Sequence, residues 1–314
     1  MYGEEMSILK LYPAGKDYLW GGTRLITEYE KHFSWDKLAE TWELSCHPDG
    51  PCTIAEGEFA GKTLNEYIQE KGVEVLGTKC KDMEQFPLLI KFIDAKNDLS
   101  IQVHPSDEYA LKKEGQYGKT EVWYIMDCQP GAFIYYGFKE SISKEELAER
   151  IHNKTLLEVL NKVEVKKGDV YFIEPGTIHS IGSGNLIAEI QQNSNVTYRV
   201  YDYGRVGTDG KERELHIDKA KEVTKCVPTK MNYEFGSHMV SCDYFTVDKH
   251  KVSEKMKGIV DDTSFASVLV LSGKGKLRAG EQVEEIKKGD SIFMDAGTGE
   301  FLVEGEVEIL ITRV

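Results

Sequence analysis

Short apolar segments separated by Gly, Asp and Asn turns follow one another along most of the chain. Segments of this length and spacing are typical of strands in a sandwich or barrel, so we predict a mainly β protein. Strands are expected at 87–95, 99–104, 121–128, 132–138, 169–174, 186–192, 196–203, 244–251, 265–271, 283–287, 290–294 and 307–312.

Fewer segments show the spacing of an amphipathic helix with a capping residue at its start. We predict helices at 63–71, 107–113, 144–161 and 215–223.

One β-unit is repeated in the sequence. Residues 166–177, KKGDVYFIEPGT, and 287–298, KKGDSIFMDAGT, share seven of twelve residues, and 121–126 has an apolar counterpart at 266–271. Two matched segments in the same order predict two related domains, 1–235 and 236–314. Only the first copy carries a helical insertion, at about 140–161.

Polar residues interrupt the apolar strands of the first copy at four places. Gln102 and His104 lie two apart and therefore share one face of a strand, and Glu121 and His179 sit on neighbouring predicted strands. Two imidazoles, a carboxylate and an amide oxygen suit Zn²⁺, Fe²⁺, Mn²⁺ or Co²⁺. The second copy has Ala266 in place of Glu121 and no histidine to match His179, so we expect it to bind no metal.

Composition excludes several classes of protein. The 314 residues carry a net charge of −14, against the sign expected of a nucleic-acid-binding protein. Residues 1–6 do not resemble a secretory signal, and no apolar run is long enough to span a membrane. None of the six cysteines forms a C-x-x-C pair, which favours reduced thiols and a cytoplasmic location. The oligomeric state cannot be predicted from these features.

A set of motifs identifies the chain more narrowly. They are WGG at 20–22, AETWE at 39–43, LIKF at 89–92, IQVHP at 101–105, KTEVWY at 119–124, PGTIH at 175–179 and TYRVYD at 197–202. Together they resemble the type I mannose-6-phosphate isomerase (phosphomannose isomerase) family of the cupin superfamily, in its short bacterial form. The resemblance covers essentially the whole chain and implies two cupin, jelly-roll-type β-barrels with a few helices inserted in the first.

The resemblance also implies a function and a site. The substrates would be mannose 6-phosphate and fructose 6-phosphate, with one Zn²⁺ per chain. The implied roles are metal ligation by Gln102, His104, Glu121 and His179; catalysis or sugar contact by Lys91, Glu189 and Arg199; and the pocket wall by Trp20 and Glu40. Our candidates for the phosphate contact are Lys119, Arg205, Lys211 and Arg213.

The residues themselves agree with this assignment. The turn at 182–185 predicts a hairpin that returns Glu189 to the metal, and alternation places Arg199 on an inner face, facing the sugar or paired with Glu189. Isomerisation through an enediol needs a base. The candidates are Glu189, Lys91 and a zinc-bound hydroxide, and the sequence does not decide between them. Burial of Lys91 near a cation would lower its pKa.

Two other functions remain open at this point. An iron(II) oxygenase of the cupin fold would use two histidines and one carboxylate, but Gln102 as a fourth ligand argues against it. A non-catalytic, sugar-phosphate-binding bicupin would not need Lys91, Glu189 and Arg199, and all three are present.

Overall fold

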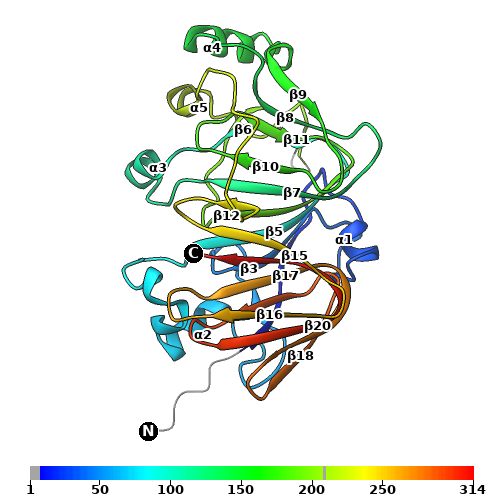
Figure 1. Cartoon of the computed structure of the whole chain (residues 1–314). Helices are drawn as coiled ribbons and strands as arrows, with labels where there is room; N and C mark the ends of the chain where they lie inside the picture. Colours follow the sequence, from blue (N-terminus) through cyan, green and yellow to red (C-terminus); the bar gives the residue numbers. More distant parts are fainter. Residues whose placement is uncertain (1–7, 208–209) are drawn as a thin grey trace.

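A computed structural model describes residues 8–207 and 210–314 of the chain. Three antiparallel sheets form two stacked β-units, so the predicted mainly β fold is confirmed (Figure 1). The first unit occupies the upper half of Figure 1 and the second the lower half.

Two sheets face each other in the first unit. The six-stranded sheet has the order β10 (Val170–Ile173), β7 (Glu121–Cys128), β12 (Asn185–Gln192), β5 (Leu88–Ala95), β3 (Glu40–Ser45) and β2 (Ala14–Lys16). The five-stranded sheet has the order β13 (Tyr198–Tyr201), β6 (Ile101–Val103), β11 (His179–Ile181), β8 (Phe133–Phe138) and β9 (Leu160–Glu164).

The second unit is built on a nine-stranded sheet. Its strands are β14 (Val240–Ser241), β15 (Thr246–Val252), β20 (Gly299–Arg313), β17 (Ala266–Ala279), β19 (Ser291–Met294), β1 (Ile8–Tyr12) and β4 (Thr53–Ile54), with β16 (Lys255–Val260) on β20 and β18 (Gln282–Lys287) on β17. Strand β1 pairs with β19, so the N-terminal segment contributes to the C-terminal sheet. The division of the chain at residue 235 therefore stays a prediction.

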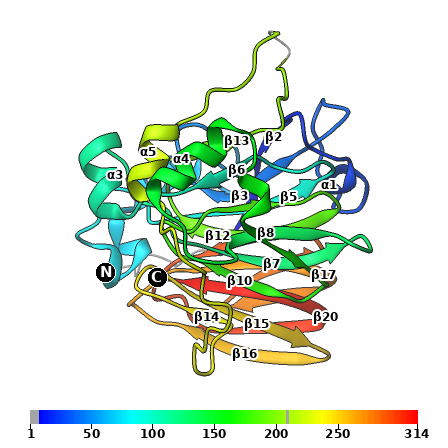
Figure 2. The same cartoon turned by 90° about the horizontal axis from the view of Figure 1, so that it is seen from above.

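The helices lie outside the sheets. They are α1 (Arg24–Thr27), α2 (Leu64–Lys71), α3 (Asp107–Glu114), α4 (Lys144–His152) and α5 (Ile217–Val223), with 3₁₀ turns at Val73–Leu76, Thr78–Cys80 and Leu156–Glu158. Figure 2 shows α3, α4 and α5 gathered on one side of the first unit. The predicted helix at 144–161 is wrong in its second half, because α4 ends at His152, Lys154 takes a positive φ of 59°, and β9 begins at Leu160.

Strand β5 separates two hydrophobic cores. Its residues Ile90 and Phe92 pack in the large cluster that joins the two units, whereas Ile93 packs inside the first barrel with Trp123. Side chains alternate across a strand, so a strand with both faces buried reads as a nearly continuous apolar run. Lys91 breaks that run, and its side chain points into the barrel with that of Ile93.

A buried ion pair ties the two units together. Lys31 Nζ lies 2.8 Å from Glu43 Oε2 on β3 and donates to the Gly289 carbonyl at 2.6 Å. Thr41 Oγ1 donates to the other carboxylate oxygen of Glu43 at 2.6 Å. Gly289 lies in the turn of the second KKGD motif, so the repeat supplies a contact between the units.

We predict that Lys31→Met lowers the free energy of unfolding by about 3 kcal/mol, because it leaves the Glu43 carboxylate buried without its cation. Lys62→Met is the matched control, since Lys62 and Glu70 form an exposed pair, and it should cost less than about 1 kcal/mol. Urea unfolding of both variants measures the difference. Equal losses would show that the buried pair does not hold the units together.

Candidate metal centre and active site

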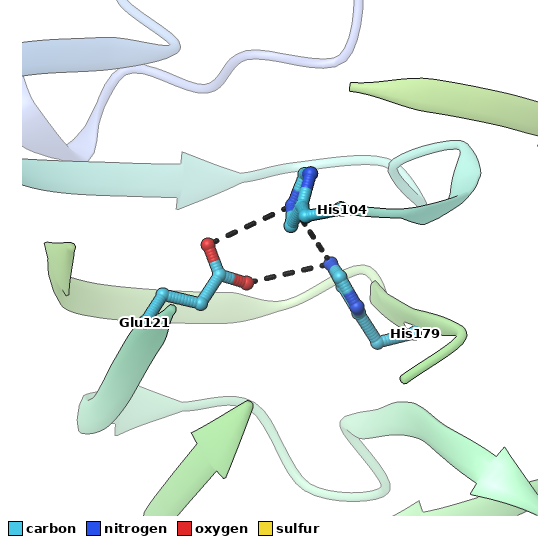
Figure 3. A group of neighbouring side chains, drawn as sticks. All are labelled: His104, Glu121 and His179. Atoms are coloured by element: carbon cyan, nitrogen blue, oxygen red, sulfur yellow. Dashed lines mark hydrogen bonds and ion pairs between the residues drawn. The ribbon is translucent and has the colours of Figure 1, made fainter. Parts of the chain in front are cut away.

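Three of the predicted metal ligands meet inside the first barrel. His104 directly follows β6, Glu121 begins β7 and His179 begins β11, so the two facing sheets both contribute (Figure 3). One ligand atom from each side chain lies within 4.8 Å of the others, and all three residues are buried. In Figure 3 the two imidazoles and the carboxylate point toward one another.

Backbone hydrogen bonds fix the protonation of both imidazoles. His104 Nδ1 lies 2.9 Å from the Val196 carbonyl oxygen, and His179 Nδ1 lies 2.8 Å from the Thr177 carbonyl oxygen. A carbonyl can only accept, so each Nδ1 carries the proton and each Nε2 carries a lone pair. Burial lowers the pKa of His179 to about 4 and that of His104 well below its usual value, so both rings are neutral.

The lone pairs of these ligands converge on one point. The two Nε2 atoms are 3.2 Å apart, and the Glu121 oxygens lie 3.7 Å from His104 Nε2 and 3.4 Å from His179 Nε2. No hydrogen bond from the described residues reaches Glu121 Oε1. Lys119 Nζ lies 3.3 Å from His104 Nε2 and 2.6 Å from Glu121 Oε2. The two Nε2 lone pairs and Glu121 Oε1 still face one another, so the donor set fits a metal ion.

Gln102 is the fourth predicted ligand and lies beside the cluster. Its amide nitrogen is 3.5 Å from His179 Nε2. Ligation through the amide oxygen requires a half-turn of the amide group, so the role of Gln102 as a ligand stays a prediction. Cross-strand register pairs Gln102 with His179 on one side and with Arg199 on the other, which places the three in one row.

Two buried lysines and a carboxylate lie next to the cluster. Lys119 Nζ is 2.6 Å from Glu121 Oε2 and 3.6 Å from Glu189 Oε1, and Lys91 Nζ is 3.1 Å from that Glu189 oxygen. Trp123 Nε1 donates to Glu189 Oε2 at 2.8 Å. The partners of Glu189 are therefore Lys91, Lys119 and Trp123. Among the described residues it forms no ion pair with Arg199, which had been the alternative.

The pKa values of Lys91, Glu189 and Glu121 are set by burial and by the charges of neighbouring groups. Burial alone would lower the pKa of Lys91, but the carboxylates of Glu40 and Glu189 outweigh it, and the pKa is raised above its ordinary value. The lowering of the Lys91 pKa that we predicted beside a bound cation stays a prediction. Burial raises the pKa of the Glu189 carboxyl, but the positive charges of Lys119 and Lys91 outweigh burial and hold this pKa at about 2. Burial raises the pKa of Glu121 to about 7, with Glu189 adding to the rise.

A pocket of about 400 Å³ lies next to the cluster, and Gln102 and Lys119 line it on the side where they approach His179 and Glu121. It brings together most of the candidate residues; the candidates that do not line it are His104, Glu121, His179, Arg205 and Lys211. The predicted residues that line it are Trp20, Glu40, Lys91, Gln102, Lys119, Glu189, Arg199 and Arg213. Tyr18, Ser100, Asn195 and Thr197 also line it and were not predicted.

The turn after β11 differs from the predicted hairpin. Strand β11 belongs to the five-stranded sheet and β12 to the six-stranded sheet, so residues 182–184 cross from one sheet to the other. Glu189 reaches the pocket because β12 pairs with β5 and β7, which sets it between Lys91 and Trp123.

Two tryptophans support the carboxylates and were missed as site residues. Trp42 Nε1 donates to Glu40 Oε2 at 2.8 Å, just as Trp123 does to Glu189. The signal was present in the sequence, because Glu40 and Trp42 lie two apart on one strand and must share a face.

Comparison with known proteins agrees with this geometry. The family model for the phosphomannose isomerase type I catalytic domain matches residues 8–125, and the model for the mannose-6-phosphate isomerase cupin domain matches 236–314. The chain is 38% identical to mannose-6-phosphate isomerase ManA of Bacillus subtilis (strain 168), over 96% of this chain and 97% of that protein. The chain belongs to the type I mannose-6-phosphate isomerase family. The predictions of this family, of the cupin fold and of an isomerase are thereby confirmed.

Other members and structures extend the comparison. Mannose-6-phosphate isomerase of Streptococcus mutans is 35% identical over 94% of each chain. The crystal structure of mannose 6-phosphate isomerase from Bacillus subtilis has a TM-score of 0.90 and 36% identity, covering 98% of this chain and 100% of that one. A mannose 6-phosphate isomerase bound with zinc and yttrium shares the fold with a TM-score of 0.78, at 18% identity.

For this family member we predict that His104→Ala loses stoichiometric metal, because one of the three converging lone pairs is removed. His238→Ala is the control, since His238 is exposed and pairs with Asp248 outside the cluster. Elemental analysis of both purified variants provides the measurement. A His104→Ala protein with the metal content of the control would exclude this cluster as the metal site.

Proposed function

We propose that this protein interconverts mannose 6-phosphate and fructose 6-phosphate, using a Zn²⁺ ion bound by His104, Glu121 and His179, with Gln102 as a fourth ligand. The observation that carries the proposal is the convergence of neutral imidazole lone pairs and a carboxylate next to a pocket that four basic residues line. Membership of the isomerase family supports the same reaction.

The choice of Zn²⁺ rests on the donor set. Imidazole nitrogen and carboxylate oxygen suit Zn²⁺, and the zinc-bound isomerase of the same fold is consistent with it. When bound, the ion supplies Lewis-acid stabilisation of negative charge on the sugar oxygens. If Gln102 is a fourth ligand, the metal ion keeps fewer open coordination positions than an iron oxygenase needs.

The chain's own residues would then move the proton between C1 and C2. Lys91 is held as an ammonium by two carboxylates, so we assign it the stabilisation of the enediol oxygens and no role as the base. We assign the proton acceptor to Glu189 from its position, since this carboxylate lines the pocket with Oε1 beside Lys91. Trp123 holds the other oxygen and so fixes which one faces the pocket.

The basic residues divide into two groups by position. Lys119 lies against Glu121, so we assign it to the metal side of the pocket. Arg199 and Arg213 line the pocket together with Ser100 and Thr197. We assign Arg213 to the phosphorylated end of the substrate, and Arg199, which pairs with Gln102 in the strand register, to the sugar oxygens that gain charge in the reaction.

We keep the cytoplasmic location as a proposal, and the state of the cysteines supports it. All six cysteines are free thiols. No helix in the described ranges is long and apolar enough to cross a membrane.

An enediol mechanism predicts that hydrogen from solvent enters the sugar. In ²H₂O, mannose 6-phosphate recovered before full conversion should carry deuterium at C2, because the proton taken by the base exchanges with water. Mass spectrometry of the recovered sugar measures this. Turnover with no deuterium in substrate or product would show that the transferred hydrogen does not exchange with water, against the predicted exchangeable base. Binding of mannose 6-phosphate without turnover would favour a non-catalytic sugar-phosphate-binding bicupin.

We predict that Arg199→Ala keeps its metal and its fold but loses about 10²–10³ in kcat, because Arg199 lines the pocket and pairs with Gln102 on the neighbouring strand. Arg199→Lys should recover little, since one ammonium cannot replace two paired guanidinium donors. Steady-state kinetics, metal analysis and thermal unfolding on one preparation check this. A folded, metal-loaded Arg199→Ala enzyme with wild-type kcat would end the assignment.

A further inference from the structure

The segment after β13 folds back beside the pocket. Tyr203 and Gly204 take positive φ angles of 57° and 66°, and the turn that they make lets the Arg205 amide donate to the Asp202 carbonyl at 3.0 Å. The tight turn therefore sets the Arg205 side chain next to the Asp202 carboxylate. Beyond it, Val206 pairs with Glu212, which returns the chain toward β13.

The buried carboxylate of Asp202 binds two arginines, Arg205 and Arg213, and we call this group of three residues the clamp. Arg213 donates from Nε to Asp202 Oδ2 at 2.7 Å and from Nη2 to Oδ1 at 2.6 Å, which is a bidentate pair. Arg205 donates from Nε to Asp202 Oδ1 at 3.1 Å and forms an ion pair with the same oxygen. Asp202 is 6% exposed, so these bonds form largely out of contact with water.

Only one of the two clamped arginines lines the pocket. Arg213 does so beside Arg199, whose Nη1 donates to the Glu214 carbonyl at 3.0 Å and whose Nε has no partner among the described residues. Two guanidinium groups on one wall repel each other. Arg213 would therefore favour a position in solvent if nothing held it at the wall.

We propose that Asp202 is a positioning residue that holds Arg213 at the pocket wall for binding the phosphate monoester of the substrate. This inference deepens the proposed function and rests on it for the identity of the substrate. Asp202 does not itself touch the substrate, since both of its oxygens are engaged by arginines.

Whether removal of the Asp202 charge strengthens or weakens substrate binding distinguishes a positioning role for Asp202 from a purely electrostatic one. Removing a negative charge near an anion site should strengthen the binding of a dianion if only charge matters. Removing the clamp should weaken binding, because Arg213 is no longer held in place and ordering it costs free energy on each binding event. The two views predict opposite shifts for the same substitution.

The first measurement compares Asp202→Asn with Glu212→Gln. Both variants lose one negative charge near Arg213, but Glu212 is exposed and lies outside the clamp. We expect Asp202→Asn to raise the KM for mannose 6-phosphate by about tenfold with little change in kcat, and Glu212→Gln to change KM by less than about twofold. A KM for Asp202→Asn that is unchanged or lower than wild type would overturn the proposal.

A double-mutant cycle tests whether Asp202 acts through Arg213. In an Arg213→Gln background, Asp202→Asn should raise KM no further, because the residue it positions is already gone. Additive effects would overturn the proposal. Arg213→Lys keeps the charge but loses the paired donors, and it should raise KM as Asp202→Asn does; this variant decides the matter if Asp202→Asn fails to fold. A wild-type KM in Arg213→Lys would refute the inference.

Binding measured without turnover keeps this test separate from that of the reaction. Titration calorimetry with mannose 6-phosphate, and with mannose as the uncharged comparison, should show weaker binding of the phosphate alone in Asp202→Asn. If the wild-type protein binds mannose 6-phosphate but does not isomerise it, the proposed reaction is refuted. The titration still tests the role of Asp202 in that case, because it measures binding and not turnover. Equal binding of mannose 6-phosphate by wild type and Asp202→Asn refutes the clamp.

Discussion

The site depends on two hydrogen bonds from imidazole to backbone. The carbonyls of Val196 and Thr177 accept from Nδ1 of His104 and His179, and this alone makes both Nε2 atoms lone-pair donors that face Glu121. The backbone that supplies these carbonyls is itself tied to the ligands. The Gly176 amide donates to the His104 carbonyl at 2.8 Å, so the PG turn joins the two ligand-bearing segments. Gly176 has a φ of 85°, and a side chain there would meet the Val223 carbonyl oxygen.

Charge around the ligands is balanced within a protein that is acidic as a whole. Three buried carboxylates, Glu40, Glu121 and Glu189, face the ammonium groups of Lys91 and Lys119. Counting formal charges, three negative against two positive leaves one negative charge at the base of the pocket, which a divalent cation would reverse. The opposite wall carries Arg199 and Arg213. A local excess of positive charge can thus attract a sugar phosphate although the chain has a net charge of −14.

The sequence predicted which polar side chains meet in the first barrel better than the paths of the chain that bring them together. Alternation put Gln102 and His104 on one face, and the turn residues placed most strands, because both signals are local. The hairpin at 182–185 was wrong because a Gly-Ser-Gly-Asn turn looks the same whether it closes a hairpin or crosses between sheets. The pairing of β1 with β19 and the contact of Lys31 with Gly289 join residues more than 250 positions apart, and no local pattern encodes them. The rise in the pKa of Lys91 was missed for the same reason, since it depends on Glu40 and Glu189 from other strands.

One short segment shows how strand register carries the chemistry. Lys119, Glu121 and Trp123 lie two apart, and each engages the site: Lys119 contacts Glu121, Glu121 faces the imidazoles, and Trp123 holds Glu189. A slip of one residue would turn all three away from the pocket and bring Thr120, Val122 and Tyr124 in. Strand β12 prevents this slip because it pairs along its length with β5 on one side and β7 on the other. The apolar residues Ile190 and Val122, which pack between the two units, fix the same register from the other face. The core shared by the two units therefore sets the orientation of the residues that face the pocket.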